Sequence, residues 1–256
     1  MHARDIRQVI ELLDTVLDDP TLAPPQLKLF PALYLQVTRS VSAGIDAGHF
    51  DDGERMDRLD TIFANRYFQA LAVWRAGGRP TGPWRVAFEF AAEERGIALQ
   101  HLLLGLNAHI NLDLSVAVAR AVPADSLEDV RADYARINEI LASMVDGAQG
   151  VLNEFSPMLD ILDRVGGGAD EALAEFSIHK ARAAAWRAAE HLVDFRSPKQ
   201  QKRSIRLLEG AIKLLARSIA RPGPLVAAAV AFIRLREDTD VEAMVHRLRT
   251  ADLNQS

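Results

Sequence analysis

The stretch LQHLLLGLNAHINLDLSVAVAR, residues 99–120, decides the fold of this chain. Strands seldom exceed about 8 residues, so an apolar run of this length predicts a helix. A helix that is apolar nearly all round is typical of the innermost layer of a protein. We therefore predict an all-α fold, a single multi-helix domain over residues 1–256 that packs around a buried central helix at about 98–120.

The segments outside this run also carry helical patterns, because their apolar residues recur at spacings of three and four. No segment alternates strongly enough to predict a strand, and about nine to eleven helices are expected. Gly166-Gly167-Gly168 is a candidate flexible point that would separate a C-terminal helical subdomain. The expected outer helices are 4–18, 26–47, 51–77, 84–94, 126–155, a short one after Ser156-Pro157, 170–195, 197–223, 225–235 and one from Asp240.

The composition is that of an ordinary globular protein, with 49% apolar and 25% charged residues. A net charge of −5 gives no electrostatic reason to expect a nucleic-acid partner. No run reaches about 18 uninterrupted apolar residues and no signal peptide is evident, so we expect a cytoplasmic protein without a membrane span. The absence of cysteine excludes disulfides and leaves His, carboxylate or amide groups as the metal ligands.

Five polar residues interrupt the central run: His101, Asn107, His109, Asn111 and Asp113. At about 100° per residue, both histidines and Asp113 drift along one face, whereas the two asparagines lie on a second face. A buried polar side chain without a partner costs about 1–3 kcal/mol. Each of the five must therefore be satisfied by another helix, by water or by a ligand.

One interpretation of this cluster is a small-molecule enzyme whose catalytic residues are His101, His109 and Asp113. An imidazole paired with a carboxylate is a suitable general base near neutral pH. Arg66, which is flanked by aromatic residues, would either direct a buried guanidinium at Asp113 or an anionic ligand, or lay its stem over the core with its head in water. The predicted substrate-binding residues are Arg66, Asn107, Asn111, Arg182 and Trp186.

A second interpretation is a non-catalytic ligand-binding or scaffold protein. Asp113 would then accept a hydrogen bond from His109 or Arg66, and Asn107 and Asn111 would bond to neighbouring backbone. Such a network fixes the register of packed helices without any ligand. No P-loop, dinucleotide fingerprint, nucleophile elbow or His-Glu-x-x-His pair is present to decide between these interpretations.

A third interpretation is a metal site, which would make the protein a metal-assisted hydrolase. His109 and Asp113 are four residues apart and can direct their side chains to one point on a helix. His179 is the predicted third ligand, because it shares a stripe with Arg182 and Trp186 that we expect to face the core. Between a protein that binds no cofactor and one that binds a divalent metal such as zinc, the sequence favours the protein without a cofactor.

The run HLLLGLNAHINLDL, with FANRYFQA before it and ARAAAWRAAEHL after it, resembles an uncharacterised bacterial family of all-helical proteins of unknown function. Members of that family carry an Asn-Ala-His-Ile-Asn-x-Asp-Leu signature, and the resemblance spans roughly residues 25–195. It implies one integral helical domain and no particular activity. The His-x-x-x-Asp pair is also similar to the zinc-binding pair of helical zinc-dependent phospholipases and nucleases, of which only His109 and Asp113 are matched.

Overall fold

A computed structural model describes residues 1–122, 126–165, 177–195 and 197–253. These residues form eleven helices if the central helix is counted once and one short 3₁₀ turn is left out, and they contain no strand, which confirms the all-α prediction. The elements are α1 (Ile6–Asp18), η1 (Pro25–Lys28), α2 (Leu29–Asp46), α3 (Gly53–Arg75), α4 (Gly82–Ala92), α5 (Ala98–Leu106), η2 (Asn107–Leu114), α6 (Ser115–Ala121), α7 (Leu127–Phe155), α8 (Asp160–Val165), α10 (Ile178–Val193), α11 (Pro198–Ala220), α12 (Pro224–Arg234) and α13 (Val241–Thr250).

The central helix runs without a break from α5 through η2 to α6, as the apolar run predicts. Its middle third, η2, is a π-helix rather than an α-helix. Nearly all of the central helix is buried. The π-helical segment η2 is Asn-Ala-His-Ile-Asn-Leu-Asp-Leu. Because π-helical turns are rare and frequently occur at functional sites, η2 is a candidate position for such a site.

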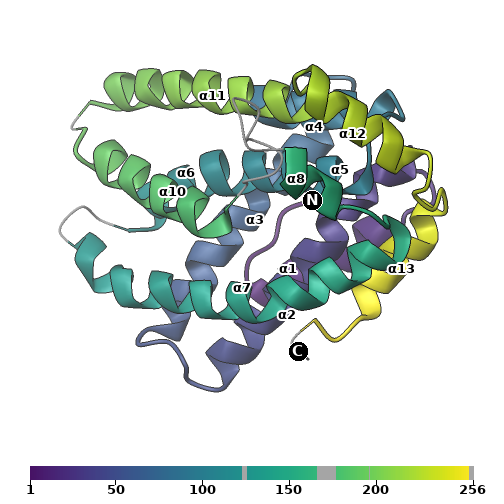
Figure 1. Cartoon of the computed structure of the whole chain (residues 1–256). Coiled ribbons are helices and arrows are strands. Elements are labelled where there is room, and N and C mark those ends of the chain that lie inside the picture. The colour runs from purple at the N-terminus through teal and green to yellow at the C-terminus, as the bar shows by residue number, and fades with distance from the viewer. Residues whose placement is uncertain (123–125, 166–176, 196, 254–256) are drawn as a thin grey trace.

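The remaining helices enclose the central helix on several sides (Figure 1). Helices α2, α3 and α4 pack against it from the N-terminal half of the chain, and α10 and α11 pack against it from the C-terminal half. Helix α7 lies on the opposite side of the molecule from α11 and packs against α2 (Figure 1).

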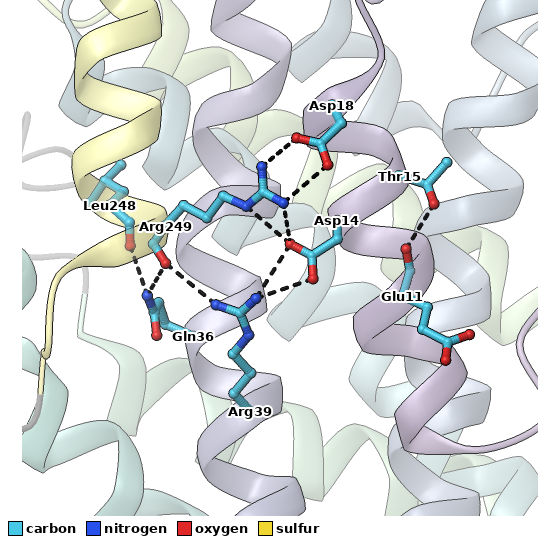
Figure 2. Close-up of polar contacts among 8 residues, drawn as sticks. All are labelled: Glu11, Asp14, Thr15, Asp18, Gln36, Arg39, Leu248 and Arg249. Carbon is cyan, nitrogen blue, oxygen red and sulfur yellow. Dashed lines mark hydrogen bonds and ion pairs between the residues drawn. The ribbon is translucent and has the colours of Figure 1, made fainter.

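The last helix, α13, is held against the start of the chain by a polar network (Figure 2). The Arg249 guanidinium donates to Asp14 at 2.6 Å and to Asp18 at 2.5 Å, and Arg39 donates to Asp14 at 3.1 Å. The Gln36 amide donates to the backbone carbonyls that end α13. The two ends of the described chain are thereby joined.

Two expectations about the outer helices need correction or stay open. The helix expected at 170–195 begins at Ile178 within the described residues, and the candidate flexible point at 166–168 lies outside them. Asp133 of α7 is fully buried, where it accepts hydrogen bonds from the backbone N–H groups of Asp51 and Asp52 at 2.8 and 3.1 Å. Its carboxylate thus holds the segment before α3 against α7.

Within the described residues, the central helix is long and apolar enough to cross a membrane, with a mean hydropathy of 1.5. Of that window, 83% is buried inside the protein, and a core helix passes the same test. Helices α11 and α12, bent by 56° at the break between them, pass it only as a pair.

Candidate functional site

Asp113 is the centre of a buried polar network in η2. The Arg66 Nε–H donates to Asp113 Oδ1 at 2.8 Å, and the Trp84 indole N–H donates to Asp113 Oδ2 at 2.7 Å. The Arg66 side chain is 13% exposed, so the ion pair is largely removed from water. Of the two possibilities that the sequence left for Arg66, the structure selects the ion pair, which joins α3, α4 and the central helix.

The two asparagines of η2 are also satisfied inside the protein. The Asn107 amide donates to the carbonyl of Ile212 on α11 at 3.3 Å, and the Asn111 amide donates to Asn107 Oδ1 at 3.0 Å. Ser115 donates to the Asn111 carbonyl at 2.7 Å. Asn107 therefore fixes α11 against the central helix through backbone, as the structural interpretation predicts, whereas Asn111 bonds to the Asn107 side chain and not to backbone.

His109 is different, because it is 2% exposed and neither of its ring nitrogens has a hydrogen-bonding partner in the described chain. Its Nδ1 lies 3.7 Å from Asp113 Oδ2, which is too long for a hydrogen bond. The imidazole stacks on Phe63 with ring centroids 3.5 Å apart and meets Tyr34 edge-on at 4.4 Å. Burial lowers the pKa of His109 below its ordinary value despite the opposing field of Asp113.

His109 lines an apolar cavity of about 100 Å³ between α2, α3, the central helix, α7 and α10. The wall includes Val145 of α7, which is 44% exposed, so the cavity reaches the surface beside α7. Most of the lining is aliphatic or aromatic. The polar groups among the described lining residues are those of Tyr34, Asp60, His109, Tyr134 and Arg182.

Two of these polar residues, Tyr34 and Asp60, have buried oxygens without a partner in the described chain. Burial is the main cause that raises the pKa of Asp60 to about 7, and the neighbouring charge of Asp57 adds to it. Burial also raises the pKa of the Tyr34 hydroxyl, and the charge of Asp60 adds to that effect. The cavity therefore gathers a phenol, a carboxyl group and an imidazole whose hydrogen-bonding capacity the protein leaves unused.

Arg182 is the one substrate-binding candidate of the sequence analysis that the described lining of the cavity includes. It is 4% exposed and donates to Asn138 Oδ1 at 2.5 Å and to the Tyr134 carbonyl at 2.7 Å. Its guanidinium lies over the Tyr134 ring at 4.1 Å. No carboxylate of the described residues pairs with it, and burial lowers its pKa.

His101, predicted to act with His109, belongs to a different part of the molecule. Its Nε2 lies 2.9 Å from the Arg95 carbonyl, and its ring packs on Phe90. Burial lowers the pKa of His101 to about 4. His101 does not belong to the described wall of the His109 cavity. Through its contact with the Arg95 carbonyl it ties the loop before α5 to the central helix.

The expected stripe on α10 is rotated from its predicted position. Arg182 and Trp186 are buried, but His179 is exposed, so the expectation that His179 faces the core is wrong. Trp186 donates to Glu190 at 2.7 Å and packs on Tyr134. Tyr134 belongs to the described wall of the cavity, whereas Trp186 does not. No group of three His, Asp or Glu side chains in the described parts of the chain is placed to hold a metal ion, which removes the donor set proposed for His109, Asp113 and His179.

The sequence analysis did not identify Trp84, Phe63, Tyr34 or Asp60 as site residues. The first three look like ordinary core aromatics in any single sequence. Asp60 carries a usable signal, because it lies three residues before Phe63 on the apolar side of its helix. A carboxylate at such a position is buried only at a cost, and that cost is a reason to suspect a site.

Comparison with known proteins gives one finding. No curated protein and no solved structure matches the chain. A family model described as a family of unknown function (DUF5995) matches residues 6–222, which include every helix that lines the cavity. The chain therefore belongs to this family of unknown function.

Proposed function

We propose that the chain binds a small, mainly apolar molecule in the His109 cavity and that the His109 imidazole bonds to, or exchanges a proton with, a polar group of that molecule. One observation carries the proposal: a buried imidazole without a partner for either nitrogen lines an apolar cavity. An unsatisfied buried polar group costs about 1–3 kcal/mol. Costs of this kind are typical of functional sites, which give up stability for activity.

The size of the cavity limits the ligand. An engineered apolar cavity of about 150 Å³ holds benzene. The cavity here, at about 100 Å³, is smaller but reaches the surface beside Val145, so it suits at most one small ring or a short branched chain. A larger molecule would place an apolar end in the cavity, and its remainder would extend to the surface along α7 past Val145.

The environment of His109 favours the role of acceptor or general base. Its lowered pKa keeps the ring neutral at pH 7. Asp113 lies on the Nδ1 side and is fixed by Arg66 and Trp84, so it favours the tautomer with the proton on Nδ1. Nε2 is then the nitrogen that accepts a hydrogen bond or a proton from the ligand.

The alternative of a purely structural network describes a different set of residues. Arg66, Trp84, Asn107, Asn111 and Asp113 bond to one another or to neighbouring helices. We infer that these five residues hold the helices in register. The binding chemistry is left to His109, with Asp60 and Arg182 in the same wall.

The test compares phenol with benzene in the wild-type protein and in His109→Phe, with binding measured by calorimetry. Phenylalanine keeps a flat ring against Phe63 and removes both nitrogens. The wild-type protein should bind phenol about tenfold more tightly than benzene, the contribution of one hydrogen bond. His109→Phe should bind benzene at least as well and lose the preference for phenol.

The same variant has a second readout that does not depend on a ligand. Because His109 makes no hydrogen bond in the described chain, His109→Phe should be at least as stable as the wild-type protein in urea unfolding. Failure of both probes to bind the wild-type protein would overturn the pocket. An unchanged preference for phenol in His109→Phe would overturn the role of the imidazole.

A further inference from the structure

Helices α11 and α12 lie along one edge of the molecule (Figure 1). Both expose large apolar side chains. On α11, Leu207 is 70% exposed and Leu214 is 62% exposed. On α12, Leu225 is 62% exposed and Phe232 is 38% exposed, and Leu235 directly after the helix is 82% exposed. Large apolar side chains exposed to this extent on two consecutive helices point to an interaction surface.

The same segment concentrates positive charge. Residues 198–236 contain nine Lys or Arg residues and one acidic residue, a net charge of +8 in a chain whose total is −5. The one acidic residue, Glu209, accepts a hydrogen bond from the Gly82 backbone N–H at 2.6 Å. Among the described residues, no ion pair engages the exposed basic side chains Lys199, Lys202, Arg203, Arg206 and Arg217 of α11.

Charge and apolar surface share one side of α11. At about 100° per residue, Arg203, Leu207, Leu214 and Arg217 fall on the outer half of the helix. The buried residues Ile212, Ala216 and Ile219 fall on the opposite half. A basic helix with leucines projecting beside its charges is the pattern of a helix that lies in the interface of a membrane.

We propose that this surface, made by the exposed apolar and basic side chains of α11 and α12, docks on an anionic lipid membrane. The basic side chains would meet acidic headgroups, and the exposed leucines would enter the boundary of the acyl chains. Lipid fits better than nucleic acid because a nucleic-acid surface offers no apolar layer for four exposed leucines. This surface is separate from the His109 cavity, whose described lining contains no residue of α11 or α12.

The experiment is co-sedimentation of the full chain with vesicles of phosphatidylcholine, with and without phosphatidylserine. We expect binding to the mixed vesicles, little binding to pure phosphatidylcholine, and loss of binding as salt rises. The test variant is Arg203→Gln/Arg206→Gln. The matched control, Arg4→Gln/Arg58→Gln, removes the same charge from exposed positions elsewhere.

Each basic residue near an anionic surface contributes about fivefold to partitioning, so the Arg203→Gln/Arg206→Gln variant should bind roughly 30-fold more weakly. The control should bind like the wild-type protein. Leu207→Ser/Leu214→Ser should weaken binding about tenfold or more, because the apolar contact is lost. All three variants change exposed side chains, and their melting temperatures show whether the fold is kept.

The proposal is overturned if the wild-type protein sediments equally with both kinds of vesicle or with neither. It is also overturned if the control weakens binding as much as the Arg203→Gln/Arg206→Gln variant does. Retention of the protein by duplex DNA at a salt concentration where the vesicles do not bind it would assign the surface to nucleic acid instead.

Discussion

Replacement of Asp60 by asparagine is expected to stabilise the protein above neutral pH. Asp60 is 8% exposed, and its Oδ2 has no partner in the described chain. Burial raises the pKa of its carboxyl group from 3.8 to about 7. Since one pH unit corresponds to about 1.4 kcal/mol, ionisation of Asp60 costs the folded state about 4 kcal/mol relative to the unfolded chain.

The sign follows from the raised pKa. Between pH 4 and pH 7 the folded state holds a proton on Asp60 that the unfolded state has lost, so stability falls as pH rises through this window. The contribution is fully present below pH 4 and lost above about pH 7. An asparagine does not titrate, so the variant lacks this fall.

The assay is urea unfolding of the wild-type protein and Asp60→Asn at pH 5, 6, 7 and 8. The difference in unfolding free energy, variant minus wild type, should rise by about 3 kcal/mol across this range. Asp60→Leu serves as a second variant and should give the same rise, because it too removes the titrating group. A difference that stays constant from pH 5 to pH 8 would refute the reasoning.

Four further substitutions test the packing and the networks. Gly105→Ala should destabilise the protein by about 1–3 kcal/mol in urea unfolding, because its Cβ would lie 2.5 Å from Phe30 Cγ. Gly210→Ala, with no atom within 4 Å of the new Cβ, should be neutral or stabilising by up to about 1 kcal/mol, and a loss equal to that of Gly105→Ala would contradict this account. Asp113→Asn should cost about 3–5 kcal/mol, because it leaves a largely buried guanidinium unpaired; calorimetry that finds less than about 1 kcal/mol would make the pair dispensable. Arg249→Ala should lower stability by about 1–2 kcal/mol by freeing α13, and unchanged amide exchange in α13 would contradict the role of the Figure 2 network.

The sequence is sufficient to predict the fold class and the central helix, because burial on all sides leaves a direct record in residues 99–120. The partner of Arg66 was one of two options that local pattern allows. The choice depends on how α3 and the central helix are placed in space. The π-helical form of η2 was not predictable, because apolar spacing of three and four residues fits an α-helix equally well.

The candidate site was less predictable than the fold. His109 and Arg182 were predicted from the sequence and both line the cavity, whereas His101 lies elsewhere. The predicted burial of His179 was wrong, because in an Ala-rich helix the sequence fits more than one choice of buried face. The cavity itself arises from the packing of helices far apart in the chain. No single segment records it, and the importance of Asp60 becomes clear only once the cavity is seen.

The central claim is that His109 is a neutral, unpartnered imidazole available to a ligand, and nitrogen NMR of the histidine rings tests it most directly. At pH 7 the His109 ring is expected to be neutral, because burial lowers its pKa, and saturating phenol is expected to shift its Nε2 resonance while benzene does not. A His109 ring that is protonated at pH 7, or whose nitrogen resonances are unchanged by phenol, would contradict this claim.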